Sequence, residues 1–239
     1  MIAKRTKTIL TVLPILLGVV LIPSASSASA EDCWGWFGKC LGTQEIHSTE
    51  SFSASGVKAR VTVPDMTTSD SCSPNGNGFS LVATWVFFPN GEWIEIGVAS
   101  GKIDETCYNS EEHHYIAYQQ NGNYYEYRLS GSVSPSDNIY YEISDTNKDM
   151  KWHAYQSGNK RAGLIMDSTY GDVAVGVESI DDDTSVPKTD VKYIKVHDGS
   201  RWSYWTYNDA EYDTNGGFIT QCTPAYKNIK VGVGGSETC

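Results

Sequence analysis

The sequence predicts an all-β fold, an antiparallel β-sandwich with disulfides. Three observations support this prediction. Apolar residues recur at every second position in several short segments, which is the period of a half-buried strand. Clusters of Gly, Asn, Asp and Ser separate these segments at short intervals, as turns do. No segment shows an amphipathic helical pattern of about 11 residues or more. Strands at this spacing are typical of a sandwich or a jelly roll.

The first element is an export signal over residues 1–30. Three basic residues within the first seven precede an apolar run over residues 9–22, and Ala28-Ser29-Ala30 ends the segment. A basic start, a short apolar run and a small-x-small end form the pattern that signal peptidase reads. The run falls short of the roughly 20 residues that span a bilayer, although an uncleaved anchor is the alternative. We expect a secreted bacterial protein that starts near Glu31 and keeps no membrane anchor.

Residues 31–50 are expected to form an irregular arm tied by disulfides. All six cysteines lie in the exported part of the chain: Cys33, Cys40, Cys72, Cys107, Cys222 and Cys239. An even number of cysteines in an oxidising compartment favours disulfides, and their pairing stays open. A zinc site is the alternative, but the chain contains no C-x2-C pair, and we predict no metal and no cofactor.

The remainder, residues 51–239, reads as one sandwich domain. Residues 57–63 alternate between apolar and polar, and residues 81–88 form a continuous apolar run that stops at the turn sequence Pro89-Asn90-Gly91. Asn121-Gly122 joins two alternating segments in the clearest hairpin of the chain. The other strands are expected at residues 93–98, 113–120, 124–129, 139–143, 150–156, 162–166, 173–179, 191–196, 202–207 and 229–233.

Composition limits the partners. The chain has 18 Lys and Arg against 29 Asp and Glu, a net charge of -11. Without residues 1–30 it keeps 15 basic and 29 acidic residues, a net charge of -14. Such a charge argues against nucleic acid or an anionic membrane as the partner. A hydrophobic fraction of 40% and an aromatic fraction of 12% argue for a buried core rather than a disordered acidic chain.

Tyrosine is distributed unevenly, because all 15 tyrosines lie at residue 108 or beyond. Alternation along the strands predicts a sheet face rich in phenol and indole rings, which can stack on sugar rings or hold an extended polymer. The candidate ligand-binding residues are Trp93, Tyr115, Tyr118, Tyr124 and Glu126. Ordinary aromatic packing between two sheets is the alternative.

Two strand carboxylates are candidates for acid and base chemistry. Glu95 lies mid-strand between Trp93 and Gly97, and Glu178 lies near the end of another strand. A carboxylate on a sheet face beside aromatic rings can have a raised pKa, and two of them are the equipment of a glycosidase or an acid peptidase. A solvent-facing strand glutamate is the alternative.

Two other polar clusters are interpreted as solvated surface. In Glu111-Glu112-His113-His114 the members alternate faces of a strand, and a surface metal or pH-sensitive site is the alternative. Asp181-Asp182-Asp183 with Asp190 lacks the spacing of an EF-hand, which makes a charged loop the better interpretation than a Ca²⁺ site.

Residues 85–97, followed by Tyr115-Ile116-Ala117-Tyr118-Gln119-Gln120, resemble the sheet core of the glutamic peptidases (eqolisins) and of secreted concanavalin-like jelly-roll proteins. The resemblance covers roughly residues 80–180 and implies that fold. In the peptidases a Gln-x-Gly-Val turn carries the catalytic Gln, and a later Ala-Glu strand carries the catalytic Glu. Here Glu95-Ile96-Gly97-Val98 has Glu in place of Gln. Ala174-Val175 lacks the Glu, unless Glu178 substitutes for it.

The sequence therefore predicts a secreted, non-catalytic protein that binds an extracellular polymer, glycan or protein through an aromatic sheet face. The first alternative is a hydrolase, related to glutamic peptidases or glycosidases, that uses Glu95 with Glu178. A structural component of an envelope or matrix is the second alternative.

Overall fold

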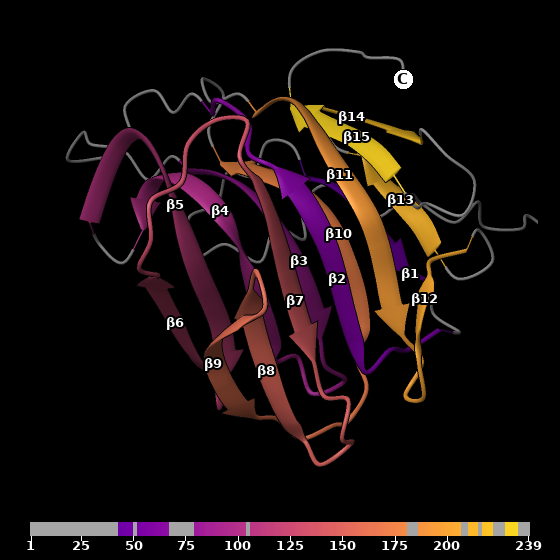
Figure 1. Ribbon diagram of the computed structural model, residues 1–239. Coiled ribbons are helices and arrows are strands. Elements are labelled where there is room, and N and C mark those ends of the chain that lie inside the picture. The colour runs from indigo at the N-terminus through magenta and orange to yellow at the C-terminus, as the bar shows by residue number, and fades with distance from the viewer. Residues whose placement is uncertain are drawn as a thin grey trace, which may run out of the picture.

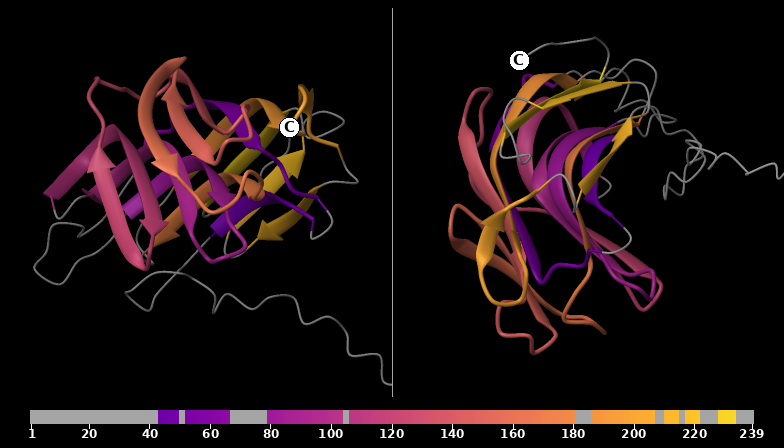
Figure 2. Two further views of the ribbon diagram at one scale, coloured as in Figure 1. Left: turned by 90° about the horizontal axis from the view of Figure 1, so that it is seen from below. Right: turned by 90° about the vertical axis from the view of Figure 1, so that its right-hand side faces the viewer.

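The computed structural model describes residues 43–49, 52–66, 79–103, 106–180, 186–206, 210–214, 217–221 and 228–233. These residues form two antiparallel β-sheets that lie face to face (Figure 1). Turned by 90°, the molecule shows the two sheets as two layers (Figure 2). The prediction of an all-β antiparallel sandwich is confirmed. No helix in the described part of the chain is long and apolar enough to cross a bilayer.

The first sheet, sheet I, has seven strands in the order β13-β1-β10-β3-β4-β5-β6. β10 lies between β1 and β3, so strands distant in sequence pair side by side, as in jelly rolls. The bounds of the strands are β1 Thr43–Ser48, β3 Phe79–Phe87, β4 Trp93–Ile103, β5 Thr106–Gln120, β6 Asn123–Arg128, β10 Asp172–Ile180 and β13 Ala210–Thr214.

The second sheet, sheet II, has the order β14-β15-β11-β2-β7-β8-β9, with β12 paired to β11. It faces the viewer in Figure 1. Its strands are β2 Gly56–Thr62, β7 Asn138–Ser144, β8 Lys151–Gln156, β9 Asn159–Ile165, β11 Val186–His197, β12 Trp202–Tyr204, β14 Gly217–Gln221 and β15 Asn228–Val233.

The core lies between the sheets and is built by the predicted alternation. Val57, Ala59 and Val61 of β2 are fully buried, and Ile94, Ile96 and Val98 of β4 meet them from sheet I in the same cluster. Apolar side chains at every second position therefore fill the interior, and the intervening side chains form the two outer faces. Burial of this apolar area is the main favourable term that holds the layers together.

Most predicted strands are confirmed to within a few residues, and so are both hairpin signals. Asn121 and Gly122 have positive φ angles of 53° and 75°, the conformation of a type I′ hairpin turn. The expectation of a wholly irregular arm over residues 31–50 is wrong in part, because β1 occupies Thr43–Ser48. β1, β13 and β14 were missed because each is short, with five or six residues.

The outer face of sheet I has an apolar cluster of its own, unlike a solvent-facing sheet surface. Leu81, Ala83, Trp85, Ala99, Tyr115, Ala117 and Ala174 are buried together there. This cluster surrounds the candidate site.

Candidate functional site

The register of sheet I places Glu95 and Glu178 on the same outer face. Glu95 of β4 pairs with Trp85 of β3, and Trp85 pairs with Ala174 of β10. Glu178 lies four residues further along β10, so it has the same parity as Ala174 and points to the same side. The sequence predicted both carboxylates as candidates, and the pairing of β10 with β3 brings them to one surface.

Glu95 is buried, with a side chain only 6% exposed. The Trp85 indole N–H donates a hydrogen bond of 2.6 Å to its Oε2 atom. The Tyr115 hydroxyl lies beside the same carboxyl and favours its ionised form, although it completes no hydrogen bond of regular geometry. Desolvation raises the pKa of Glu95 by more than these two contacts lower it. Burial, followed by the charge of Glu178, raises the pKa of Glu95 to about 8.

Glu178 is partly buried near the end of β10. Desolvation raises the pKa of its carboxyl to about 7. Because the charge on each carboxylate opposes ionisation of the other, the two protons leave the pair in coupled steps. The pair therefore retains at least one proton at neutral pH, which is the condition for one acid and one base to coexist.

Small residues lie on the face between the two carboxylates. Ala83, Gly97 and Gly176 form one cross-strand row, midway along the strands between the level of Glu95 and the level of Glu178. A Cβ atom added at Gly97 would collide with the carbonyl oxygen of Val82 and lie 2.8 Å from Cα of Ala83. The glycine is thus required by close packing of the two backbones. Because glycine has no side chain, the sheet surface between the two carboxylates is also open at this position.

Trp93 and Tyr124 form an aromatic pair at one end of this face. Their ring centroids lie 5.8 Å apart, and Tyr124 is 53% exposed. Tyr124 aligns with Gln119 of β5, which aligns with Trp93, so both rings occupy the level next to Glu95. Glu126 of β6 lies level with Glu95, and its charge also raises the pKa of Glu95.

The predicted ligand-binding residues do not all share this face. Tyr115 lies on it but is fully buried, so its ring is closed to ligand stacking. Tyr118 points to the opposite side, packs against the core and stacks on Tyr125 at 4.9 Å. Trp93, Tyr124 and Glu126 remain together beside the carboxylates. The phenol-rich strands therefore divide their rings between core packing and surface.

Sequence reasoning missed Trp85 as a partner of Glu95. The signal was present, because the turn at Pro89-Asn90-Gly91 sets the register of the β3–β4 hairpin. The paired residues flanking that turn, Phe87 with Trp93, place Trp85 opposite Glu95 two positions further on. A tryptophan opposite a buried glutamate is a hydrogen-bond donor in reach of its carboxyl.

The interpretation of His113 and His114 as a solvated strand end is wrong. Both histidines are buried. His113 lies on the outer face of sheet I, level with Glu178, and burial lowers its pKa to about 4. His114 points into the sandwich, where its Nδ1 atom lies 2.7 Å from the Tyr141 hydroxyl. Alternation of the two residues between faces is confirmed.

Some predictions fall outside the described residues. These are the signal over residues 1–30, the side chains of all six cysteines, and Asp181-Asp182-Asp183. Asp190 is described and forms an ion pair of 2.6 Å with Lys192. Within the described residues, no cluster of His, Cys, Asp and Glu side chains could hold a metal ion.

No protein-family model and no curated protein sequence matches the chain. Among solved structures, a family 18 polysaccharide lyase is similar at 14% identity and a TM-score of 0.35, over 59% of this chain and 56% of the lyase chain. The chain thus spans little more than half the length of that relative. A tetrameric galectin from the sponge Cinachyrella sp. matches 65% of this chain and 99% of its own, at 9% identity and a TM-score of 0.40.

The catalytic domain of an endo-1,3-beta-glucanase (laminarinase) from Thermotoga petrophila RKU-1 matches more of the chain. It covers 81% of this chain and 77% of its own, at 10% identity and a TM-score of 0.35. Similarity at these values identifies neither a family nor an activity for this chain.

Proposed function

We propose that the protein is a hydrolase of an extracellular polysaccharide that uses Glu95 as the general acid and Glu178 as the general base. The observation that carries the proposal is a pair of carboxylates on one sheet face, Glu95 buried and Glu178 partly buried, with raised pKa values of about 8 and about 7. Strongly perturbed pKa values caused by burial and a second charge are typical of catalytic sites.

The difference in burial assigns the roles. Glu95 is more deeply buried than Glu178, and burial favours the protonated carboxyl, so Glu95 protonates the glycosidic oxygen as the bond to the anomeric carbon breaks. The Glu178 carboxylate takes a proton from a water molecule, whose oxygen bonds to that carbon. The proton then returns from Glu178 to Glu95 through solvent. Trp93 and Tyr124 supply ring faces on which a sugar can stack.

The register favours inversion of the anomeric centre. Two strand spacings and four residues along the strand separate the two Cα atoms by roughly 16 Å on a flat sheet. The two carboxyl groups reach the spacing of inverting glycosidases, about 6.5–9.5 Å, when both side chains lean toward each other over the row of Ala83, Gly97 and Gly176. Retaining enzymes, with carboxyl groups about 5–5.5 Å apart, fit this placement less well.

The test measures release of reducing ends from a panel of neutral and acidic polysaccharides, and of peptides from casein, between pH 4 and pH 9. We expect turnover of a polysaccharide. E95Q and E178Q should each lose about 100-fold or more of kcat, the usual contribution of a general acid or base. The matched control is E111Q, which makes the same change at an exposed carboxylate of β5.

Full activity of E95Q would refute the role of the pair, and cleavage of casein alone would make the pair that of a peptidase. Proton NMR of the first product should show the inverted anomer.

A non-catalytic glycan-binding protein is the second candidate. The exposures of the side chains favour this candidate, because Tyr124 is open to a ligand whereas the Glu95 carboxyl, which would have to reach the substrate, is almost covered. Under this proposal the wild-type protein binds a polysaccharide without cleaving it, W93A loses the binding, and E95Q retains it.

A further inference from the structure

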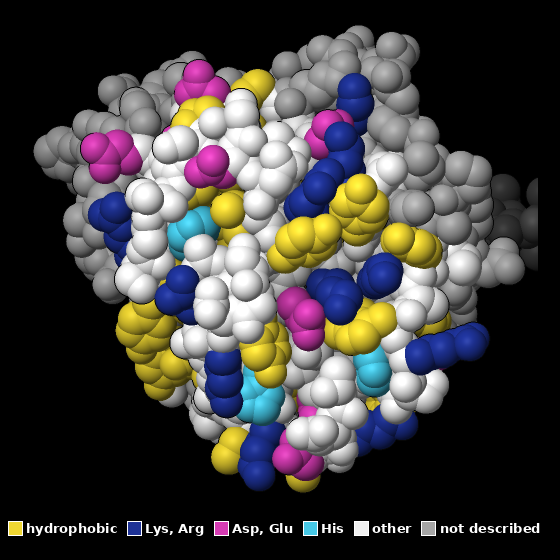
Figure 3. Space-filling model, in the orientation of Figure 1, with side chains coloured by type: hydrophobic (Ala, Val, Ile, Leu, Met, Phe, Trp, Pro, Cys, Tyr) yellow, Lys and Arg dark blue, Asp and Glu magenta, His cyan; other side chains and the backbone are white. Residues whose placement is uncertain are grey.

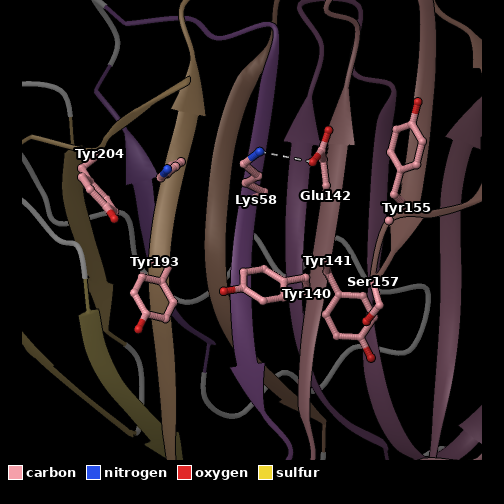
Figure 4. Close-up of a pocket in the computed structure, with 10 residues that line it drawn as sticks. Lys58, Tyr140, Tyr141, Glu142, Tyr155, Ser157, Tyr193 and Tyr204 are labelled. Carbon is pink, nitrogen blue, oxygen red and sulfur yellow. Dashed lines mark ion pairs between the residues drawn. The ribbon is translucent and has the colours of Figure 1, made fainter. Parts of the chain in front are cut away.

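A second candidate site lies on the other side of the molecule, on the outer face of sheet II. A cavity of about 400 Å³ opens there, and we call it the tyrosine groove. Its lining includes Lys58, Tyr140, Tyr155, Tyr193, Lys195 and Tyr204. Figure 4 shows these tyrosines on different strands, with Lys58 between them beside Glu142.

The rings occupy two neighbouring rows that cross the strands, with Tyr204 and Tyr155 in one row and Tyr193 and Tyr140 in the next. Tyr204 comes from β12, Tyr193 from β11, Tyr140 from β7 and Tyr155 from β8. The strand order β12-β11-β2-β7-β8 spans four strand spacings, roughly 19 Å. Tyr140 is 43% exposed and Tyr193 is 37% exposed. An extended ligand lying across the strands would meet the rings in a staggered order, and would lie beside Lys195 and Lys58 between Tyr204 and Tyr155.

The backbone at Tyr193 is strained. Its φ angle is 56°, in the left-handed region that a tyrosine rarely adopts. The pairing of β11 with β2 shifts register between Lys192 and Lys195, which marks a β-bulge at this position. Bulges redirect side chains, and strained residues cluster at binding sites. The bulge therefore places the Tyr193 ring in the groove at a cost in backbone energy.

Cationic groups lie among the rings, with Lys195 and Lys58 next to each other in one row and Arg60 between Tyr193 and Tyr140 in the next. Lys58 Nζ lies 3.9 Å from the Trp202 ring centroid, and Lys195 Nζ lies 4.9 Å from that of Tyr204. The Arg60 guanidinium lies 4.6 Å from the Tyr193 ring, and its buried Nε has no hydrogen-bond partner. Lys58 Nζ also lies 3.6 Å from Oε2 of Glu142, in an ion pair. Lys195 makes no ion pair with any described residue. Cations held against rings are positioned for an anionic ligand.

The charge of this face is opposite to that of the whole chain. Among the described side chains of the strands of sheet II, eight are basic and only two, Glu142 and Asp190, are acidic. The basic side chains are Lys58, Arg60, Lys151, Lys160, Arg161, Lys192, Lys195 and Lys230. Figure 3 shows Lys and Arg interspersed with hydrophobic side chains over this face. The strands of sheet II are thus basic, although the chain has a net charge of -11.

We infer that the tyrosine groove binds an acidic polysaccharide, one whose sugars carry carboxylates, with sugar rings stacked on the tyrosines and carboxylates beside Lys58, Arg60 and Lys195. Flat, exposed rings repeated across the strands suit the faces of sugars. The few cations suit the one charge per residue of a uronic acid polymer. The denser charge of double-stranded DNA, about one per 1.7 Å of helix axis, would be repelled more strongly by the acidic remainder of the molecule. The inference is independent of the carboxylate pair on sheet I.

The test is isothermal titration with oligogalacturonate, against the carboxyl-reduced oligomer of the same length. We expect binding to the acidic oligomer that weakens as salt is added, and weaker binding of the neutral one. K195A and K58A should each weaken binding about tenfold, the effect of about 1.4 kcal/mol. Y140A should weaken binding by a similar factor.

R128A and Y127A are the matched controls, because Arg128 and Tyr127 are both exposed on β6 of sheet I, away from the groove. Both should bind as the wild type does. Circular dichroism melting verifies the fold of each variant. Y193F, which keeps the ring at the strained position, serves as a second variant that should retain binding.

Several outcomes would overturn the inference: no binding of the acidic oligomer, equal binding of the neutral oligomer, or equal losses in the controls. Tighter binding of single-stranded DNA or of an acidic peptide would assign the groove to another partner. E95Q should leave this binding unchanged, so failure of the proposed hydrolase and failure of the groove are separate results.

Discussion

At the scale of single residues, the Glu95 carboxyl is controlled by two opposing effects. Burial raises its pKa, and the hydrogen bond from the Trp85 indole lowers it. A catalytic acid must keep its proton until the reaction begins, and desolvation favours this by raising the pKa of Glu95. The hydrogen bond from the Trp85 indole limits how far that pKa rises. The two pKa values predict a bell-shaped dependence of kcat/KM on pH, with a maximum between about 7 and about 8.

W85F tests this control. Removing a donor that favours the ionised form should raise the pKa of Glu95 further and move the alkaline limb of kcat/KM to higher pH. We expect a shift of about one pH unit, because a hydrogen bond to a charged group contributes about 1.5 kcal/mol and one unit corresponds to about 1.4 kcal/mol. Carbon-13 NMR titration of Glu95 measures the same shift without turnover. W93F is the control, and an unchanged or lowered pKa in W85F would contradict the prediction.

At the scale of elements, the β3–β4 hairpin builds the centre of the site. Its turn sets a register in which Trp85 faces Glu95 and Ala83 faces Gly97. The hairpin is local in sequence, so the turn and the alternation predict its geometry. β10 completes the site only because it pairs with β3 across a long stretch of chain.

G97A tests the close approach of β3 and β4. An added methyl group must displace the Val82 carbonyl or the backbone of Ala83, so we expect a loss of about 1–3 kcal/mol in the free energy of unfolding in urea. G163A is the matched control in β9. There a Cβ atom would meet chiefly the end of the Lys160 side chain, at 3.1 Å from Nζ, which can move away. Equal stability of G97A and the wild type would refute the packing argument.

At the scale of the whole molecule, buried titratable groups on sheet I make stability depend on pH in two directions. The pKa of Glu95 is raised to about 8, so its folded state binds the extra proton, and stability falls as pH rises from about 4.5 to 8. The pKa of His113 is lowered to about 4, so stability falls as pH drops from about 6.5 to 4. The pKa of Glu178, raised to about 7, acts in the same direction as that of Glu95, so the three groups together predict a maximum at about pH 4.5.

Urea unfolding across pH 4 to 9 measures this curve. E95Q should flatten its alkaline side by an amount on the order of a few kcal/mol, and H113Q should flatten its acid side. The E111Q variant, at an exposed carboxylate, should leave both sides unchanged. A wild-type protein that grows more stable from pH 5 to pH 8 would contradict the assignment for Glu95.

Charge is the other property of the whole molecule. The net charge of -11 argues against polyanionic partners when the charge is taken as uniform. The fold separates the charges, because sheet I presents Glu95, Glu126 and Glu178 on its outer face while the strands of sheet II carry mostly lysine and arginine. An anionic sugar polymer is thus compatible with one side of an acidic protein.

The sequence by itself determined the class of fold, most strands, both hairpins and the two candidate carboxylates, because alternation and turn chemistry are local properties of the chain. Only the tertiary structure decided that Glu95 and Glu178 share a face, since that depends on which distant strand lies beside β3. It also decided that Tyr115 is covered while Tyr124 is open. The tyrosine groove depends on a bulge in β11 and on five strands from distant parts of the chain. Periodicity tells which side chains alternate, but the neighbours that bury a charge or complete a groove come from long-range pairing.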